Sequence, residues 1–158
     1  METIWAPWRM TYIERVRPST CLFCEAAYTQ HDEQDLLLYR GRSVFVLMNL
    51  YPYNPGHLMI APYRHLDDLG RLAPDEQVEL IQEAARCTKV LRETMSPDGF
   101  NLGMNQGKLA GAGIEDHLHF HVVPRWNGDT DFMPIVGGTK VISEAPAAAY
   151  KKLVSLFR

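Results

Sequence analysis

Polar and apolar residues alternate most regularly in the stretch His117–Val122. This period of two is typical of a β-strand, whose successive side chains point to opposite faces. At a rise of about 3.3 Å per residue, its three imidazoles would stand about 6–7 Å apart on one face, and the apolar residues between them would face a core. A buried imidazole needs a partner for each ring nitrogen, so three in a row indicate a polar site rather than packing.

Short apolar runs predict four further strands. Leu36–Tyr39 and Val44–Met48 flank a glycine-containing turn and predict a β-hairpin. His57–Ala61 follows a loop rich in proline and glycine, and Pro62–His65 ends it. Phe100–Asn105 is the fourth run. With the histidine stretch, the pattern predicts an antiparallel sheet of about five strands.

Two stretches have helical periodicity. Pro74–Met95 begins with a proline and two acidic residues, which suit the first turn of a helix. Its predicted buried face is a stripe at three- and four-residue steps, with Cys87 beside it as core filling: Val78, Ile81, Ala85, Thr88, Leu91 and Met95. The second helix spans Ser143–Arg158, with Ser143 as its cap. The predicted fold class is α+β, with one long helix across the sheet and a C-terminal helix.

The composition is that of an ordinary globular protein, since 46% of the 158 residues are hydrophobic and 22% are charged. A net charge of −3 provides no electrostatic basis for general nucleic-acid binding. No apolar run approaches the ~20 residues of a membrane span. Met1–Trp5 lacks the basic and apolar regions of a signal peptide. We therefore expect a cytoplasmic protein that binds neither nucleic acid nor membranes.

A chain of this length suits one domain, so residues 1–158 are assigned to a single domain. Residues 1–20 form an N-terminal arm rich in aromatic and arginine residues, and residues 127–158 form a C-terminal tail and helix. The arm carries Trp5 and Trp8, which need a surface to cover. Either the arm packs on its own domain or it contacts another copy of the chain.

Two of the three cysteines, Cys21 and Cys24, are separated by two residues. Without an export signal, this spacing favours metal or redox chemistry, and the βαβ pattern expected of a thioredoxin-type site is missing. Three assemblies stay open: a metal site of all three histidines, catalysis by one histidine that the others orient, or a divided row. In the divided row His117 joins both cysteines and His65 in a closed Cys₂His₂ zinc site, which leaves His119 free for catalysis.

A glycine-rich loop, Gly107–Gly113, leads into the histidine stretch. Glycines let backbone N–H groups approach phosphate oxygens closely, so the loop suits an anion. Beside a row of histidines it indicates attack on phosphorus. A neutral imidazole would attack, a covalent phospho-histidine would form, and N–H donors would hold the developing charge.

His117–Val123 has the order histidine, apolar, histidine, apolar, histidine and two apolar residues, and it resembles the motif of the histidine triad (HIT) family of nucleotide-binding proteins. Asn49, the Pro55–His57 turn, the strand end at His65 and the helix from Pro74 fall in the family's order. Within the family, the resemblance is closest to the bacterial diadenosine tetraphosphate phosphorylases, through four segments: the arm from Trp5–Arg9 to Tyr12–Ile13, the loop Ala110–Gly113, the stretch His121–Trp126, and the tail from Asp131–Pro134 to Thr139–Val141.

The resemblance implies a HIT-like fold and a role for each matching position. His119 would be the nucleophile, and His121 and His57 would complete the catalytic group. The implied substrate contacts are to ribose by Asn49, to adenine by Phe45 and Leu47, and to phosphate by Asn105, Gly111 and Gly113. One structural zinc per chain would be held by Cys21, Cys24, His65 and His117. Family members commonly pair, so we expect a homodimer or a higher homo-oligomer.

The implied substrates are adenine nucleotides, chiefly dinucleoside polyphosphates, with inorganic phosphate as the acceptor. Diadenosine tetraphosphate would then give ADP and ATP. Water as the acceptor would release AMP, as a dinucleoside polyphosphate hydrolase or an adenosine phosphoramidase does. The alternative from another class is a non-catalytic, zinc-stabilised nucleotide-binding module. Many family members carry glutamine where this chain has Gly113, and its absence would leave room for inorganic phosphate.

Overall fold

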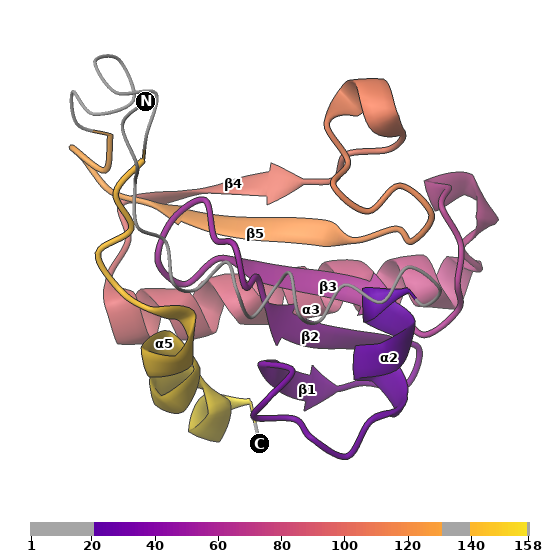
Figure 1. Ribbon diagram of the computed structural model, residues 1–158, viewed down its shortest axis with the longest axis horizontal. Coiled ribbons are helices and arrows are strands. Elements are labelled where there is room, and N and C mark those ends of the chain that lie inside the picture. Colours follow the sequence, from indigo (N-terminus) through magenta and orange to yellow (C-terminus); the bar gives the residue numbers. More distant parts are fainter. Residues whose placement is uncertain (1–20, 131–139, 158) are drawn as a thin grey trace, which may run out of the picture.

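The computed structural model describes residues 21–130 and 140–157 (Figure 1). Its strands are β1 (Leu37–Arg40), β2 (Val44–Met48), β3 (Leu58–Pro62), β4 (Gly99–Gly103) and β5 (Phe120–Arg125). Its helices are α2 (Leu22–Tyr28), α3 (Pro74–Met95) and α5 (Pro146–Leu153), with short 3₁₀ helices at Leu69–Arg71, Lys108–Ala110 and Val154–Leu156. The predictions made for the arm, residues 1–20, and for residues 131–139 lie outside the described residues.

The five strands form one antiparallel sheet in the order β1-β2-β3-β5-β4. β5 comes last in the chain but lies between β3 and β4, so it is an inner strand. Its neighbours place Met59 of β3 on one side of His121 and Gly103 of β4 on the other. The predicted α+β class and the antiparallel sheet of about five strands are confirmed.

The two faces of the sheet are covered differently. The larger core cluster lies between one face and the helices α3 and α5. On the other face α2 covers only β1, β2 and β3, through a smaller cluster built around Phe23. Figure 1 shows α3 passing behind the sheet and α2 in front of it. His121 of β5 lies on this second face, beside the part that α2 covers.

The long helix has the predicted bounds, Pro74–Met95, but its predicted buried face is wrong. Val78 and Ile81 are 56% and 58% exposed. The helix instead buries a shifted stripe: Leu80, Ala84, Cys87, Val90 and Leu91. Of the predicted stripe, Leu91 is buried and Met95 packs half-buried against the core. Both stripes have helical spacing, and packing against β3 and β5 selects between them. The prediction that Cys87 belongs to the core is confirmed.

Two predicted elements begin later than expected. The histidine strand starts at Phe120, so His117 and His119 lie in the segment that leads into β5. The alternation persists through this segment, because Leu118 is buried in the core on the α3 side. The C-terminal helix begins at Pro146 and its N-cap residue is Ala145, so Ser143 lies two residues too early to cap it.

No helix within residues 21–130 and 140–157 has the length and apolar content to cross a bilayer.

Candidate active site and metal centre

Strand pairing brings three histidines into one group on the α2 side of the sheet. Met59 lies opposite His121, and His57 precedes Met59 by two residues, so His57 and His121 share a face. The ring centroids of His57 and His121 are 5.1 Å apart, and those of His119 and His121 are 4.8 Å apart. All three side chains are buried. The structure therefore brings together the three residues predicted to be catalytic.

Hydrogen bonds assign the proton of each imidazole in this group. The backbone N–H of Tyr53 donates to His57 Nδ1 over 3.1 Å, so that nitrogen is an acceptor. The proton of a neutral His57 is therefore on Nε2, which donates to His121 Nδ1 over 2.9 Å. His121 then carries its own proton on Nε2, and this buried N–H has no partner among the described residues. A buried donor without a partner suits an incoming anionic oxygen.

His119 is the other tautomer, with its proton on Nδ1. Its Nδ1 lies 2.8 Å from the carbonyl oxygen of His117, which can only accept, so Nδ1 carries the proton. Nε2 therefore has a free lone pair. The ring is held by Phe23, whose centroid is 4.8 Å away, and by the edge contact with His121. A neutral imidazole with one fixed N–H and one free lone pair is suited to nucleophilic attack.

Burial keeps these imidazoles uncharged at neutral pH. Burial and the neighbouring His121 and His119 lower the pKa of His57 to about 3. Burial and His119 lower the pKa of His121 to about 4. Burial also lowers the pKa of His119 from its ordinary value. The assigned proton positions therefore persist throughout the neutral range.

A second cluster lies next to this group and consists of the four residues predicted to bind zinc. Cys21 Sγ is 3.3 Å and Cys24 Sγ is 3.6 Å from His117 Nδ1, and Cys24 Sγ is 3.3 Å from His65 Nδ1. All four candidate ligand atoms lie within 4.8 Å of one another. A tetrahedron with zinc–sulfur and zinc–nitrogen bonds of about 2.3 and 2.0 Å has edges of about 3.3–3.8 Å. The four residues can therefore hold a metal ion.

Hydrogen bonds from surrounding groups orient the candidate ligands of this cluster. His117 Nε2 donates to the carbonyl oxygen of Pro62 over 2.9 Å, so its Nδ1 lone pair faces the two sulfur atoms. Both cysteines come from α2 or its N-terminal end, and Arg40 of β1 holds the other end of this helix. The Arg40 guanidinium donates to the carbonyl oxygens of Thr29 and Ala26 over 2.9 and 3.3 Å.

The predicted substrate-binding residues have different positions. Asn49 donates from Nδ2 to His57 Nδ1 over 3.3 Å, and Asn105 lines a hollow beside His121. Two more lie in the exposed loop before His117, namely Gly111 and Gly113. The last two, Phe45 and Leu47, are buried in the cluster beneath α2, so neither side chain has an exposed surface on which a base could stack. The substrate contacts of all six stay predictions.

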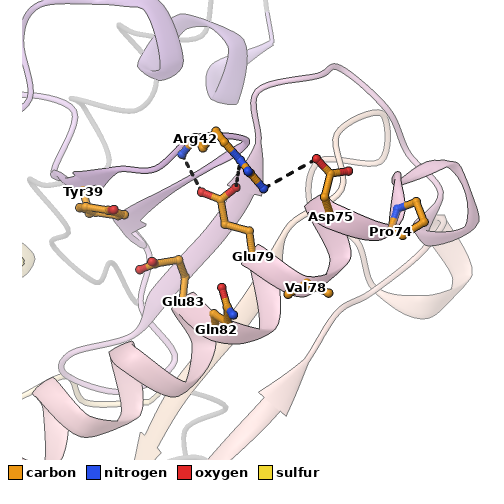
Figure 2. A pocket seen from close by; sticks show the side chains of 8 residues that line it. All are labelled: Tyr39, Arg42, Pro74, Asp75, Val78, Glu79, Gln82 and Glu83. Carbon is orange, nitrogen blue, oxygen red and sulfur yellow. Dashed lines mark hydrogen bonds and ion pairs between the residues drawn. The ribbon is translucent and has the colours of Figure 1, made fainter.

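A separate hollow of about 570 Å³ lies between the β1–β2 turn and the first half of α3 (Figure 2). Its lining includes Asp75, Glu79 and Glu83. Arg42 pairs with Asp75 and Glu79 over 3.7 and 3.8 Å. The described residues that line this hollow include no histidine, and its carboxylates would repel phosphate. It is therefore separate from the candidate active site.

Sequence reasoning missed two residues of the site. Phe23 packs against both His117 and His119, with ring centroids 5.1 and 4.8 Å away, and so joins the candidate metal-binding cluster to the candidate nucleophile. Tyr53 assigns the His57 tautomer through its backbone and contacts the His57 and His121 rings. Phe23 lies between the two cysteines in the sequence, and this position could have indicated that it packs beside the site. A backbone donor such as that of Tyr53 leaves no mark in the residue pattern.

Comparison with known proteins identifies the family. Residues 30–128 match the HIT domain model, and the chain belongs to the HIT family. It is 40% identical over 152 residues to the AP-4-A phosphorylase of Mycobacterium tuberculosis (strain ATCC 25618 / H37Rv), which covers 91% of this chain and 78% of that one. It is 36% identical over 92 residues to the bis(5'-adenosyl)-triphosphatase of Dictyostelium discoideum, covering 58% of this chain and 61% of that one. The resemblance noted in the sequence is thus confirmed.

Solved structures show the same fold. A Zn-bound histidine triad family protein from Mycobacterium smegmatis superposes with a TM-score of 0.67 at 23% identity, over 87% of this chain and 93% of that one. The hypothetical histidine triad nucleotide-binding protein ST2152 from Sulfolobus tokodaii strain7 has the same TM-score and identity, over 87% and 91% of the two chains.

Proposed function

We propose that the protein cleaves dinucleoside polyphosphates through a nucleotidyl-histidine intermediate on His119, and that inorganic phosphate is the acceptor. The observation that carries this proposal is that two neighbouring imidazoles are different tautomers, with the proton on Nδ1 in His119 and on Nε2 in His121. His119 offers a lone pair on Nε2, and His121 offers an N–H beside it. The 40% identity to an AP-4-A phosphorylase supports the same chemistry.

In the first step His119 Nε2 attacks the α-phosphorus of diadenosine tetraphosphate. The Nε2–P bond forms, the bond from phosphorus to the bridging oxygen breaks, and ATP leaves with the bonding electrons. The imidazole becomes cationic, and its Nδ1–H already donates to the His117 carbonyl oxygen, which stabilises that charge. The His121 N–H donates to an oxygen of the transferring phosphoryl group.

In the second step an oxygen of inorganic phosphate attacks the same phosphorus. The P–O bond forms, the N–P bond breaks, and ADP leaves while His119 returns to its neutral form. Gly113 supports phosphate as the acceptor, since it adds no side chain to the loop that leads into the site. A Cβ at this position would meet nothing within 4 Å.

Product analysis tests the acceptor. Diadenosine tetraphosphate is incubated with the purified protein at saturating phosphate and without phosphate, and the nucleotides are separated by ion-exchange chromatography. We expect ADP and ATP in equal amounts with phosphate, and a shift to AMP and ATP in its absence. If no ADP forms at saturating phosphate, the phosphorylase proposal fails and the protein is a hydrolase.

The same assay on Gly113→Gln tests whether Gly113 determines the choice of phosphate over water as the acceptor. The added carboxamide would occupy the space left for the acceptor, so we expect the ratio of ADP to AMP to fall several-fold. Gly113→Ala is the matched control, because it adds the Cβ without the amide and should keep the wild-type ratio. A wild-type ratio in Gly113→Gln would exclude Gly113 as the determinant.

We further propose that the ion held by Cys21, Cys24, His65 and His117 is zinc. Two thiolates and two imidazoles are a donor set that zinc prefers, and four protein ligands leave no open position, so the metal would be structural. Zinc would fix α2 and Phe23 against His119. Thiol ligands stay reduced in the cytoplasm, and we place the protein there.

We also infer that the chain is a single domain and assembles as a homodimer. β4 is an outer strand of the sheet, and it carries Leu102, which is 51% exposed. An outer strand with an exposed apolar side chain is a ready pairing surface. Sedimentation equilibrium should give twice the chain mass of 18.0 kDa, about 36 kDa. A mass of one chain at micromolar concentration would exclude the dimer.

A further inference from the structure

A second hollow, of about 460 Å³, lies on the open face of the sheet beside His121. The strand register explains its position. Gly103 lies opposite His121, and Asn101 lies opposite Val123, so these residues of β4 and β5 share one face. Gly103 has no side chain, and a Cβ there would meet nothing within 4 Å. The floor next to His121 is therefore open, and it continues along β5 to Arg125 for about 13 Å.

The lining of this hollow is polar and carries positive charge. It contains Arg125 and Lys140 together with three asparagines, and no carboxylate belongs to its described lining. The acidic hollow of Figure 2 has the opposite character. A wall of amides and cations without carboxylates suits a polyanion.

The two cations differ in how far their charge is compensated. Arg125 binds both oxygens of Asp129, over 2.6 and 2.9 Å, so its charge is largely neutralised. Lys140 donates to the side-chain oxygen of Asn54, a neutral group. No salt bridge involving Lys140 is found in the described part of the chain. Lys140 is thus the cation available to a ligand.

Lys140 is also held in place by a buried support. Asn54 is 2% exposed, and its Nδ2 donates to the Pro124 carbonyl oxygen over 2.9 Å and to Asp129 over 2.7 Å. Its remaining oxygen then points to Lys140. One buried amide therefore ties Lys140 to the end of β5. The fixed position reduces the entropy that a free lysine would lose on binding.

From these observations we infer that this hollow is the subsite for the leaving half of the substrate, a nucleoside polyphosphate, and that Lys140 binds its phosphates. His121 lines the hollow, its ring contacts that of His119, and its Nε2–H has no partner among the described residues, so the α-phosphate would sit beside it. The chain of phosphates would run from there toward Lys140. This inference rests on the proposed function and adds a specificity for long, highly charged leaving groups.

Two substrates that share the transferred adenylyl group but differ in the leaving group test the inference. Diadenosine tetraphosphate releases ATP, whereas adenosine 5'-phosphoramidate releases ammonia, which cannot reach Lys140. For Lys140→Gln we expect kcat/KM for the tetraphosphate to fall about 10- to 100-fold, the size of one charge-assisted hydrogen bond. Turnover of the phosphoramidate should change less than about twofold. Lys140→Arg should recover most of the loss.

Calorimetric binding gives an independent readout. Lys140→Gln should weaken ATP binding about 10-fold or more and leave AMP binding unchanged, while Lys89→Gln, on the exposed face of α3, should change neither. Equal losses for both substrates, or unchanged ATP affinity, would overturn the subsite. If the wild-type protein turns over neither substrate, the proposed function fails, but the comparison of ATP with AMP still decides on the subsite.

Discussion

Replacing His119 with asparagine is expected to reduce turnover of diadenosine tetraphosphate by about 10⁴- to 10⁶-fold, the range found when a catalytic nucleophile is removed. Asparagine has no lone pair that can form a nucleotidyl intermediate. The neighbouring His57–His121 hydrogen bond does not involve His119, so the binding of AMP should change little. Initial rates with phosphate and calorimetric titration with AMP measure the two quantities.

His31→Asn is the matched control for this substitution, because His31 is exposed and distant in sequence from the triad. It should retain wild-type turnover and binding. Protein denatured under alkaline conditions, in which a phosphorus–nitrogen bond is stable, after incubation with radiolabelled substrate should carry label in the wild type and none in His119→Asn. Substantial turnover by His119→Asn would assign the nucleophile to another residue.

Replacing Cys24 with serine is expected to remove about one zinc per chain and to lower the melting temperature by roughly 10 °C. Serine is a poor zinc ligand, and three remaining ligands do not close the tetrahedron. The loss should be local at first, because the core on the α3 side contains none of the four ligands. Metal analysis, thermal melting and hydrogen exchange of the α2 amides measure these effects.

Cys87→Ala separates the loss of metal from the loss of a cysteine. Cys87 is fully buried in the core beside α3, so its truncation should cost about 1–2 kcal/mol of stability through a small cavity while zinc stays at the wild-type level. Cys24→Ser with one full equivalent of zinc would show that the metal is bound elsewhere.

Much of this fold follows from local patterns. The period of two in His117–Val122 correctly predicts which side chains face the core, even for the residues that precede β5. Pro74 and the apolar repeat give α3 its bounds. The spacing of Cys21 and Cys24, with His65 and His117, indicates one of three possible assemblies, and the resemblance to the HIT family selects it. The structure brings the four candidate ligand atoms within 4.8 Å of one another.

What could not be predicted depends on tertiary packing. Two apolar stripes on α3 have acceptable spacing, and only the position of β3 and β5 decides that Ile81 is exposed and Leu80 is buried. α2 is seven residues long, too short for periodicity to be read, and its contacts are all distant in sequence. Phe45 is buried because α2 packs over it, so its burial could not be predicted without α2. The support of Lys140 by Asn54 joins residues 86 positions apart.

The order of the candidate metal ligands along the chain has a consequence for biosynthesis. Cys21 and His117 are 96 residues apart, and the segment between them contains four of the five strands. At about 5–20 residues per second, a ribosome needs roughly 5–20 s to add the last ligand after the first. During that interval His65 and the strands β1 to β3 are made, but Cys21 and Cys24 still lack His117, which lies close to both sulfur atoms. The nascent chain therefore depends on a reducing environment during its own synthesis.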